Sequence, residues 1–193
     1  VAGVAERMAA HEGTAAFLGN VSRLVCDTNR EEHDPAAIPE MSDGREIPGN
    51  LGIDREARLA RFHRPFNEAL DRLLDKVPPS LILVLHSFTP QLACDPEGQR
   101  PWHCGLLYDQ DDRGARYAQP LLEADGLHVG DQLPYSGKIY NAAIKRHIES
   151  EGRPYLYIEI RQDLIADEAG QAEWADRLRR ICGKLALEMV GLG

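Results

Sequence analysis

The longest unbroken apolar run of this chain, Leu81 to Leu85, follows a pair of prolines and ends at a histidine. These five residues are too few to cross a bilayer, which takes about 20 apolar residues in a helix. A continuous apolar run of this length, bounded by Pro78-Pro79, is typical of a central strand that is covered on both faces. The run therefore predicts a sheet with helices packed on each side.

Helix-like and strand-like segments alternate along the chain, which predicts a layered α/β domain with helices on a mostly parallel or mixed sheet. In the segment 55–77, apolar residues recur every three or four positions and so share one face of a long helix. The segments expected to be helical are 1–11, 55–77, 115–124, 140–151 and 168–189. The segments expected to be strands are 14–18, 22–26, 81–85, 103–108, 127–129 and 155–160.

The segment 32–54 is too long and too broken for an ordinary connection between secondary-structure elements. It contains several prolines together with Gly44, Gly49 and Gly52, which favour turns. Long loops of this kind usually line or cover a functional site. We therefore expect this segment to lie beside the site.

The length and composition of the chain fit one globular domain. Its 193 residues are enough to bury a core without disulfides, and the shares of hydrophobic (43%) and charged (27%) residues are ordinary for a soluble protein. The formal net charge of −9 repels phosphate backbones, so nucleic acid is not expected as a partner. A membrane is not expected as a partner either, because no apolar run is long enough to cross one. An anionic small substrate is compatible with this charge if a few arginines converge in a cleft.

The cysteines show no CxxC spacing that would indicate a zinc or redox motif. Most of them lie in apolar or strand-like surroundings, which suit buried free thiols. The chain shows no secretory signal, so a cytoplasmic location is expected. The cysteines are Cys26, Cys94, Cys104 and Cys182.

His86 directly follows the apolar run, at the carboxyl end of the predicted strand. Open α/β sheets place their ligand crevices at these strand ends, and an imidazole there can coordinate a metal. A histidine that merely caps the strand and bonds a neighbouring carbonyl fits the same position. Both interpretations of His86 stay open at this point.

Asn29 and Arg30 come just after the strand expected at 22–26. An arginine fork binds a carboxylate through two hydrogen bonds and the adjacent amide adds a donor, so this pair suits an acidic substrate. Within the strand, alternation would place Arg23 and Asp27 on one face. The alternative is a solvated loop that carries an Arg-Asp pair on the surface.

Alternation along 155–160 places Tyr155, Tyr157 and Glu159 on one face of a strand, with apolar residues on the other. A carboxylate in such a strand can act as a general base if a partly dry cleft raises its pKa. An edge strand with its polar face in water explains the same alternation.

Arg146 lies on the helix expected at 140–151, and its position alone fits an ordinary polar helix face.

The chain carries a series of short motifs in a definite order. Each motif is short, but their joint order is hard to obtain by chance. The motifs are Ser22-Arg23-Leu24-Val25, Asp27-Thr28-Asn29-Arg30, Ile38-Pro39-Glu40, Pro48-Gly49-Asn50, Leu85-His86-Ser87-Phe88, Arg100-Pro101-Trp102-His103, Pro134-Tyr135-Ser136-Gly137, Arg146-His147 and Ile158-Glu159-Ile160-Arg161-Gln162-Asp163-Leu164. Together they resemble the N-formylglutamate amidohydrolase family over nearly the whole chain.

This family is similar in fold to zinc carboxypeptidases and to the aspartoacylase group. The resemblance therefore implies a three-layer α/β fold of the phosphorylase/hydrolase type, with a mixed central sheet flanked by helices. It also implies a zinc-dependent amidohydrolase that acts on a small-molecule N-acyl amino acid such as N-formylglutamate. The acyl group would be formyl, with acetyl or a larger acyl group as alternatives that stay open, and the amino acid would be acidic.

The resemblance also assigns roles to individual residues. His86 would be a ligand to one catalytic zinc ion, and Glu159 would be the general base and acid. Zinc would polarise both a water molecule and the scissile carbonyl, so that no serine or cysteine nucleophile is needed. The remaining assignments are Asn29 and Arg30 as the clamp for a substrate carboxylate, Arg23 as the residue that steadies the oxyanion, and Arg146 as a second anion contact.

By the same resemblance, residues 1–193 would form a single amidohydrolase-like catalytic domain that lacks the family's N-terminal segment. The family has two further zinc ligands in a short His-containing motif before the first helix, and this sequence begins after that point. The segment 1–10 already has the pattern of an amphipathic helix without a preceding cap. We therefore expect the other zinc ligands upstream of Val1.

Two other functions fit parts of the sequence. Because a catalytic zinc takes three protein ligands and only one is identified, a metal-free protein that binds acidic metabolites is one alternative. A thiol hydrolase that uses Cys26 or Cys104 is another, although the sequence places no histidine near either thiol. The chain has no GxGxxG, GxxxxGKS/T or GxSxG motif, which argues against nucleotide binding and against a serine hydrolase.

Overall fold

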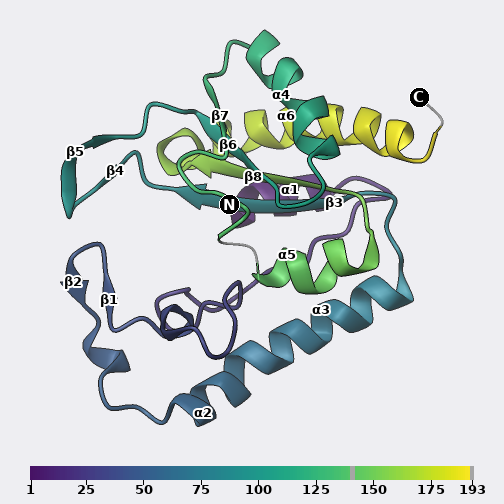
Figure 1. The fold of residues 1–193 in the computed structure, drawn as a ribbon. Coiled ribbons are helices and arrows are strands. Elements are labelled where there is room, and N and C mark those ends of the chain that lie inside the picture. Colours follow the sequence, from purple (N-terminus) through teal and green to yellow (C-terminus); the bar gives the residue numbers. More distant parts are fainter. Residues whose placement is uncertain (140–141, 192–193) are drawn as a thin grey trace.

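A computed structural model of the chain describes residues 1–139 and 142–191, and at its centre lies a mixed sheet with helices on both faces (Figure 1). The first pair of neighbouring strands, β3 (Ile82–Phe88) and β8 (Tyr155–Arg161), runs parallel. β8 then pairs antiparallel with β6 (Cys104–Leu107), which pairs in parallel with β7 (Val129–Asp131). The predicted mixed α/β fold is therefore confirmed.

Helices lie in layers on the two faces of this sheet (Figure 1). One face is covered by α1 (Ala2–Ala9), α4 (Arg113–Ala124) and α6 (Glu168–Met189). The main core of the molecule fills the space between these helices and the sheet. The other face is covered by α5 (Ala142–His147), and α3 (Arg64–Lys76) packs against α5.

The strand expected at 81–85 forms as β3, but it is not central. Among the described strands, β3 lies at the edge of the sheet and pairs with β8 alone. Its two faces nevertheless pack on different apolar clusters, with Leu83 and Leu85 on the main core and Ile82 and Val84 on the α5 side. This packing on both faces explains the continuous apolar run without requiring a second neighbouring strand.

Neither of the two strands expected at 14–18 and 22–26 forms. Residues 22–26 make a turn, in which the N–H groups of Val25 and Cys26 both donate to the Ser22 carbonyl, at 2.8 and 3.1 Å. The apolar residues of this region instead anchor a loop, because Cys26 packs in a small core of its own with residues of the segment 32–54 and of the following helix. The prediction that Arg23 and Asp27 share a strand face is therefore wrong.

The long segment 32–54 contains only short elements. Its loop structure was expected, but its hairpin was not. The elements are η1 (Pro35–Ala37), β1 (Met41–Ser42), β2 (Arg45–Glu46) and η2 (Pro48–Asn50). At the tip of the hairpin, the Asp43 carboxylate accepts hydrogen bonds from the N–H groups of Ala93 and Cys94, both at 2.9 Å. These residues form the turn of a second unpredicted hairpin, β4 (Gln91–Leu92) and β5 (Asp95–Gln99).

The helix expected at 55–77 forms with an irregularity in its middle. It consists of α2 (Arg55–Arg58), a π-helical turn η3 (Leu59–His63) and α3. Pro65 has no N–H group to donate to the Arg61 carbonyl, so the regular α-helical bond cannot form at this point. The wider turn accommodates this missing donor and ends at His63.

The other expected elements are confirmed with small shifts at their ends. The helices at 1–11, 115–124 and 168–189 are α1, α4 and α6, and the strands at 103–108, 127–129 and 155–160 are β6, β7 and β8. The helix expected at 140–151 is α5 followed by a 3-10 turn, η4 (Glu149–Glu151), and residues 140 and 141 lie outside the described residues. Within the described part of the chain, no helix is long and apolar enough to cross a membrane.

Candidate active site

The parallel pairing of β3 with β8 places His86 next to Glu159, at the carboxyl ends of the two strands. Alternation along both strands puts these side chains on the sheet face that α5 covers. The ring of Tyr157 lies on the same face, with its centroid 5.3 Å from that of the His86 ring. Two residues that the sequence singled out from separate strands are thus direct neighbours.

Glu159 is only 6% exposed. Burial raises the pKa of its carboxyl group to about 7, because a charged carboxylate loses its hydration there. Three interactions oppose this shift: a hydrogen bond that the Tyr157 hydroxyl donates to Oε1 at 3.3 Å, and the positive charges of Arg23 and Arg100. The result is a carboxyl group that exchanges its proton near neutral pH.

His86 is partly buried beside this carboxyl group. Burial lowers the pKa of its imidazole, and the nearby charge of Arg23 acts in the same direction, while the charge of Asp27 opposes them. The ring is therefore neutral at pH 7, which is the form that a metal or a hydrogen-bond donor requires of a histidine nitrogen.

Asp27 organises the loop that faces these two side chains, and its role was not predicted. It is 8% exposed, and its carboxylate lies 3.1 Å from Arg23 Nη2 and 3.6 Å from Arg30 Nε. It also accepts a hydrogen bond from the backbone N–H of Asn29, at 3.0 Å. One buried carboxylate thus fixes the two arginines that the sequence assigned to substrate, although the Arg23 side chain remains 65% exposed.

Asn29 connects this loop to the rest of the site. Its Oδ1 accepts a hydrogen bond from the N–H of Ala143 in α5, at 3.1 Å. Its side chain also hydrogen-bonds the hydroxyl of Tyr157, which in turn donates to Glu159. Tyr157 is therefore a second residue that sequence reasoning missed, although its place on the face of Glu159 was visible from strand alternation.

Arg146 lies at the surface of the site, whereas Arg100 lies close to Glu159. Arg146, on α5, forms an ion pair with Glu31 at 2.6 Å and lies on the surface. Arg100 is close enough for its charge to act on Glu159, and its Nη1 donates to the Tyr135 hydroxyl at 2.9 Å. No role was predicted for Arg100, and the only sign of it was its place in the motif 100–103.

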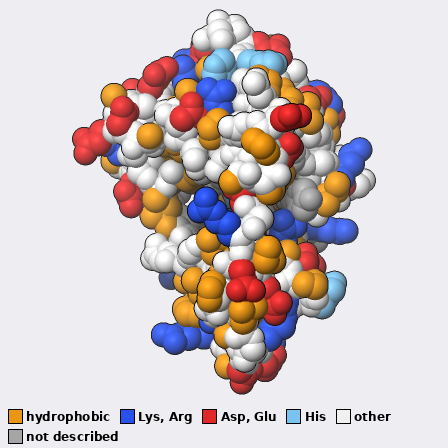
Figure 2. All heavy atoms as spheres, turned by 90° about the vertical axis from the view of Figure 1, so that its left-hand side faces the viewer, with side chains coloured by type: hydrophobic (Ala, Val, Ile, Leu, Met, Phe, Trp, Pro, Cys, Tyr) orange, Lys and Arg blue, Asp and Glu red, His pale blue; other side chains and the backbone are white. Residues whose placement is uncertain are grey.

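The hairpins β1–β2 and β4–β5 project on the side of the molecule toward which β3 and β8 run (Figure 1). Figure 2 shows this side, which is hollowed near its centre, with Lys or Arg side chains flanking the hollow. A surface depression of about 370 Å³ is lined by Leu24, Val25, Ile47, Gly49, Asn50, Arg58, Arg61 and Phe62. Its lining does not include any of the predicted site residues Arg23, Asn29, Arg30, His86, Arg146 and Glu159.

The described residues do not by themselves fit a catalytic zinc ion. Among residues 1–139 and 142–191, no group of three or more His, Cys, Asp or Glu side chains is arranged to hold a metal. A catalytic zinc takes three protein ligands, and His86 has the right chemistry for one of them. Residues 1–139 and 142–191 therefore supply part of a zinc site at most.

The thiol alternative finds no support in the structure. Cys104 is fully buried, and burial raises the pKa of its thiol to about 12. Cys26 is 1% exposed, and burial raises its pKa as well. A buried thiol that stays protonated at neutral pH is a poor nucleophile.

The chain has a mixed sheet with a buried carboxyl group and a histidine at the ends of two neighbouring strands. These features place it in the class of α/β proteins whose site lies at the carboxyl edge of the sheet. Within that class, the model of the N-formylglutamate amidohydrolase family matches residues 1–166, and the chain belongs to this family. The resemblance found in the sequence motifs is thereby confirmed. The family supports a hydrolase of the amidohydrolase type with a small-molecule substrate.

The solved structures that are similar to this chain include the following two. The gene product Atu2144 from Agrobacterium tumefaciens is 30% identical, with a TM-score of 0.82, over 97% of this chain and 76% of that one. The N-formylglutamate amidohydrolase from Ralstonia eutropha JMP134 is 20% identical, with a TM-score of 0.62, over 88% of this chain and 74% of that one. At this lower identity the likeness concerns the fold. No curated protein matches the chain.

Proposed function

We propose that this chain hydrolyses the N-acyl amide of an acidic amino acid, such as N-formylglutamate, with Glu159 as the general base and acid. The observation that carries this proposal is the burial of Glu159 beside His86, with a carboxyl pKa raised to about 7. A group with a pKa near the working pH can both accept a proton and return it during one turnover. Membership in the amidohydrolase family supplies the reaction class.

In this proposal the loop 27–30 binds the substrate. Arg30 and Asn29 bind a substrate carboxylate, since a guanidinium fork and an adjacent amide match its geometry. Arg23, which Asp27 holds at 3.1 Å, stabilises the negative charge that develops on the carbonyl oxygen. Arg146 is a second anion contact at the edge of the site, where a substrate carboxylate would compete with Glu31 for it.

The chemistry proposed for Glu159 is a proton transfer in two directions. Its carboxylate takes a proton from a water molecule, whose oxygen attacks the carbonyl carbon of the amide. The C–N bond then breaks, and Glu159 returns the proton to the leaving nitrogen. The products are a carboxylate, which is formate for a formyl substrate, and the free amino acid. Tyr157 and Arg100 favour the ionised form of Glu159 that begins this sequence.

Among the described residues, His86 is the one that would bind a zinc ion. When bound, a zinc ion lowers the pKa of water to about 7 and polarises a carbonyl group. We propose His86 as one ligand, with the others supplied from outside the described residues. Metal analysis of the full-length protein and of His86→Ala tests this point. About one equivalent of zinc in the wild type and a clear loss in the variant are expected, and equal zinc content in both would remove His86 from the metal site.

The substrate proposal is tested by release of formate from N-formylglutamate by the full-length protein. N-formylglutamine and N-formylisoglutamine, in which one carboxylate is replaced by an amide, serve as matched substrates. Hydrolysis is expected for N-formylglutamate, with a much higher KM for at least one of the two amides. Turnover that does not distinguish the three compounds would contradict a carboxylate clamp at Asn29 and Arg30.

A second candidate function is a metal-free binding protein for acidic metabolites. It is favoured by the lack of a metal-holding group of three side chains within the described part of the chain. In this case the full-length protein would bind N-formylglutamate without releasing formate and would contain no zinc. Turnover together with stoichiometric zinc would rule out this candidate.

A further inference from the structure

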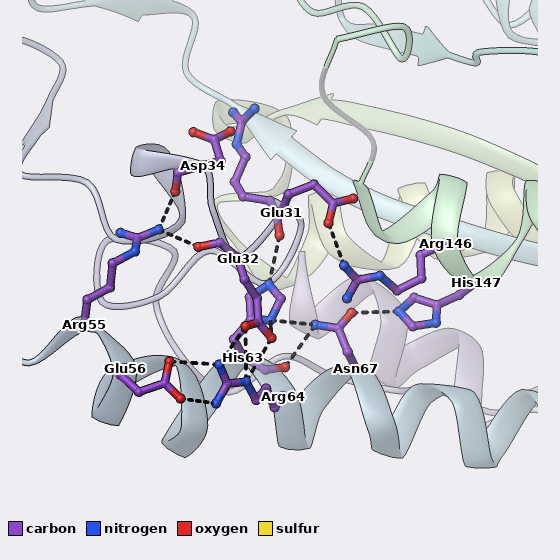
Figure 3. A network of polar contacts seen from close by, with 11 residues as sticks. Glu31, Glu32, Asp34, Arg55, Glu56, His63, Arg64, Asn67, Arg146 and His147 are labelled. Carbon is purple, nitrogen blue, oxygen red and sulfur yellow. Dashed lines mark hydrogen bonds and ion pairs between the residues drawn. The ribbon is translucent and has the colours of Figure 1, made fainter.

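A continuous series of polar side chains runs from the loop 27–34 into the space between α3 and α5 (Figure 3). It contains three side chains that are almost fully buried: His63, Asn67 and His147. Their hydrogen bonds go to residues other than Glu159 and His86, so the chemistry proposed above leaves them unexplained. Buried polar groups of this kind cost folding free energy unless every partner is in place.

His63 forms the contact between this series and the proposed substrate loop. Its Nε2 lies 2.8 Å from the carbonyl oxygen of Arg30, and its side chain is 0% exposed. Because a carbonyl oxygen only accepts, His63 carries a proton on Nε2 and donates it. His63 is also the last residue of the π-helical turn η3, a feature that often occurs at functional sites.

The second ring nitrogen of His63 is fixed by Asn67. The amide nitrogen of Asn67 lies 3.3 Å from His63 Nδ1 and 2.9 Å from the His63 carbonyl oxygen, so it donates to both. This arrangement turns the Asn67 oxygen toward His147 Nε2, at 2.7 Å. His147 Nδ1 then lies 2.5 Å from the Asp71 carboxylate. The orientation of the His63 ring is thus fixed by Asn67 on α3, which His147 on α5 holds in turn, and His63 Nδ1 also lies 3.6 Å from the Glu32 carboxylate in the loop.

The outer part of the loop is held by charged groups that are more exposed. Arg64 pairs with Glu32 at 2.8 Å, and Arg55 donates to the carbonyl oxygens of Glu32 and Asp34, at 2.8 and 2.5 Å. Exposed ion pairs contribute little and weaken with salt. The buried bond from His63 to Arg30 is the contact that reaches the residue proposed to bind substrate.

We propose that His63 is a positioning residue for substrate binding, which holds the backbone of Arg30 so that its guanidinium meets the substrate carboxylate. Asn67 and His147 act through His63 by fixing its ring. This inference rests on the proposed role of Arg30 and goes beyond it, because it places the specificity for a carboxylate partly in the helix α3 and its π-helical turn.

The test compares two substitutions of His63 in the full-length protein. His63→Gln keeps an N–H donor near the Arg30 carbonyl, whereas His63→Leu removes it. For N-formylglutamate, His63→Leu is expected to raise KM at least tenfold and to leave kcat within about threefold of the wild type. His63→Gln is expected to restore KM to within about threefold. Loss of kcat without a rise in KM would overturn the proposal.

Selectivity separates positioning from a general loss of structure. His63→Leu is expected to reduce the preference for N-formylglutamate over its poorer amide analogue, since the carboxylate contact is the one affected. A control variant, Leu74→Ala, removes a buried side chain further along α3 and lowers stability without touching the polar series. It is expected to leave the preference unchanged. The same loss of preference in both variants would make His63 merely structural.

A double-mutant cycle tests whether His63 acts through Arg30. In the background of Arg30→Gln, the change His63→Leu is expected to have no further effect on KM. Equal effects in both backgrounds would refute the proposal. Equilibrium binding of N-formylglutamate, measured by calorimetry, gives the same comparison without turnover. If the protein binds N-formylglutamate in a His63-dependent way but does not hydrolyse it, the proposed function is wrong and the role of His63 in binding is supported.

Discussion

Glu159 is held almost completely out of water in β8, and this burial affects both its chemistry and the stability of the fold. Its neighbours partly offset the effect of burial on its pKa, and among the described residues Tyr157 does so through a side-chain hydrogen bond. A buried acid whose pKa is tuned by one nearby hydroxyl can be tested by removing that hydroxyl.

For Tyr157→Phe we expect the acidic limb of the pH profile of kcat/KM to move to higher pH. The hydrogen bond from Tyr157 lowers the pKa of Glu159, so its loss raises this pKa, and the base form appears only at higher pH. The measurement is kcat/KM for N-formylglutamate between pH 5 and 9 in both proteins. An acidic limb at the same pH, or at lower pH, would show that Tyr157 does not tune the essential base.

Burial of Glu159 also predicts how stability depends on pH. Its pKa is 4.5 in the reference state and about 7 in the fold, so the folded protein prefers the protonated form. The stability that it contributes is present below pH 4.5 and is lost as the pH rises through 7. At pH 9 the metal-free Glu159→Gln variant should therefore be more stable than wild type, by up to about 3 kcal/mol.

Urea unfolding of the two metal-free proteins at pH 5 and pH 9 measures this difference. The gain from Glu159→Gln should be small at pH 5 and large at pH 9. A gain that is equal at both pH values would mean that the carboxyl group does not titrate with a raised pKa.

The contact between α4 and β8 depends on the absence of a side chain at Gly114. A Cβ atom there would lie 2.0 Å from the backbone carbonyl oxygen of Tyr155, which cannot move without disturbing β8. Gly183 in α6 is the matched case, since a Cβ atom at this exposed helical position would meet nothing within 4 Å. Replacing each glycine by alanine therefore separates the effect of close packing between helix and strand from the effect of helix propensity on stability.

We expect Gly114→Ala to destabilise the protein by about 1–3 kcal/mol, because overpacking forces α4 away from β8. Gly183→Ala should instead stabilise it by about 0.5–1 kcal/mol, because alanine favours a helix. Chemical denaturation of both variants measures the two changes. If both substitutions changed the free energy of unfolding in the same direction, the packing of α4 on β8 would be looser than described.

The elements that bear strong periodicity were predictable, and those that depend on distant partners were not. The closing helix α6 and the strand β8 follow directly from apolar spacing. The strand expected at 22–26 is a turn, because the apolar Cys26 serves a small local core and not a sheet. Alternation in a short segment cannot distinguish these two uses of an apolar residue.

The candidate site was predictable to a similar degree. Asn29, His86 and Glu159 were singled out by position and by resemblance, and the structure brings their environments together through Tyr157. Asp27 and His63 were not recognised, since their roles arise from contacts with residues that are distant or in a loop. No spacing in the sequence reveals that a helix histidine lies under the carbonyl oxygen of Arg30.

Charge is distributed unevenly over the whole molecule. The chain has a formal net charge of −9, yet the residues that face or influence Glu159 include Arg23 and Arg100, with Arg30 nearby on the same loop. A local concentration of positive charge in an acidic protein is consistent with an anionic substrate.

The fold shields most of its thiols, which gives a prediction for the intact protein. Cys94 is exposed, whereas Cys26 and Cys104 are buried and Cys182 has a pKa raised to about 12 by burial. We expect Ellman's reagent to modify Cys94 in the native state, although the hydrogen bond to Asp43 raises the pKa of this thiol, and the other thiols only after unfolding. Hydrolysis of N-formylglutamate should persist after this modification. Loss of activity upon modification of a single thiol would support a mechanism with a cysteine nucleophile.

The central claim is that Glu159 transfers the proton in the hydrolysis of an N-acyl amide. The most direct measurement is kcat for N-formylglutamate in the full-length, zinc-loaded wild type and in Glu159→Gln, which keeps the size of the side chain and removes the base. The variant should lose about 10²- to 10⁴-fold in kcat while its zinc content stays the same. A kcat within threefold of the wild type at equal zinc content would contradict the account.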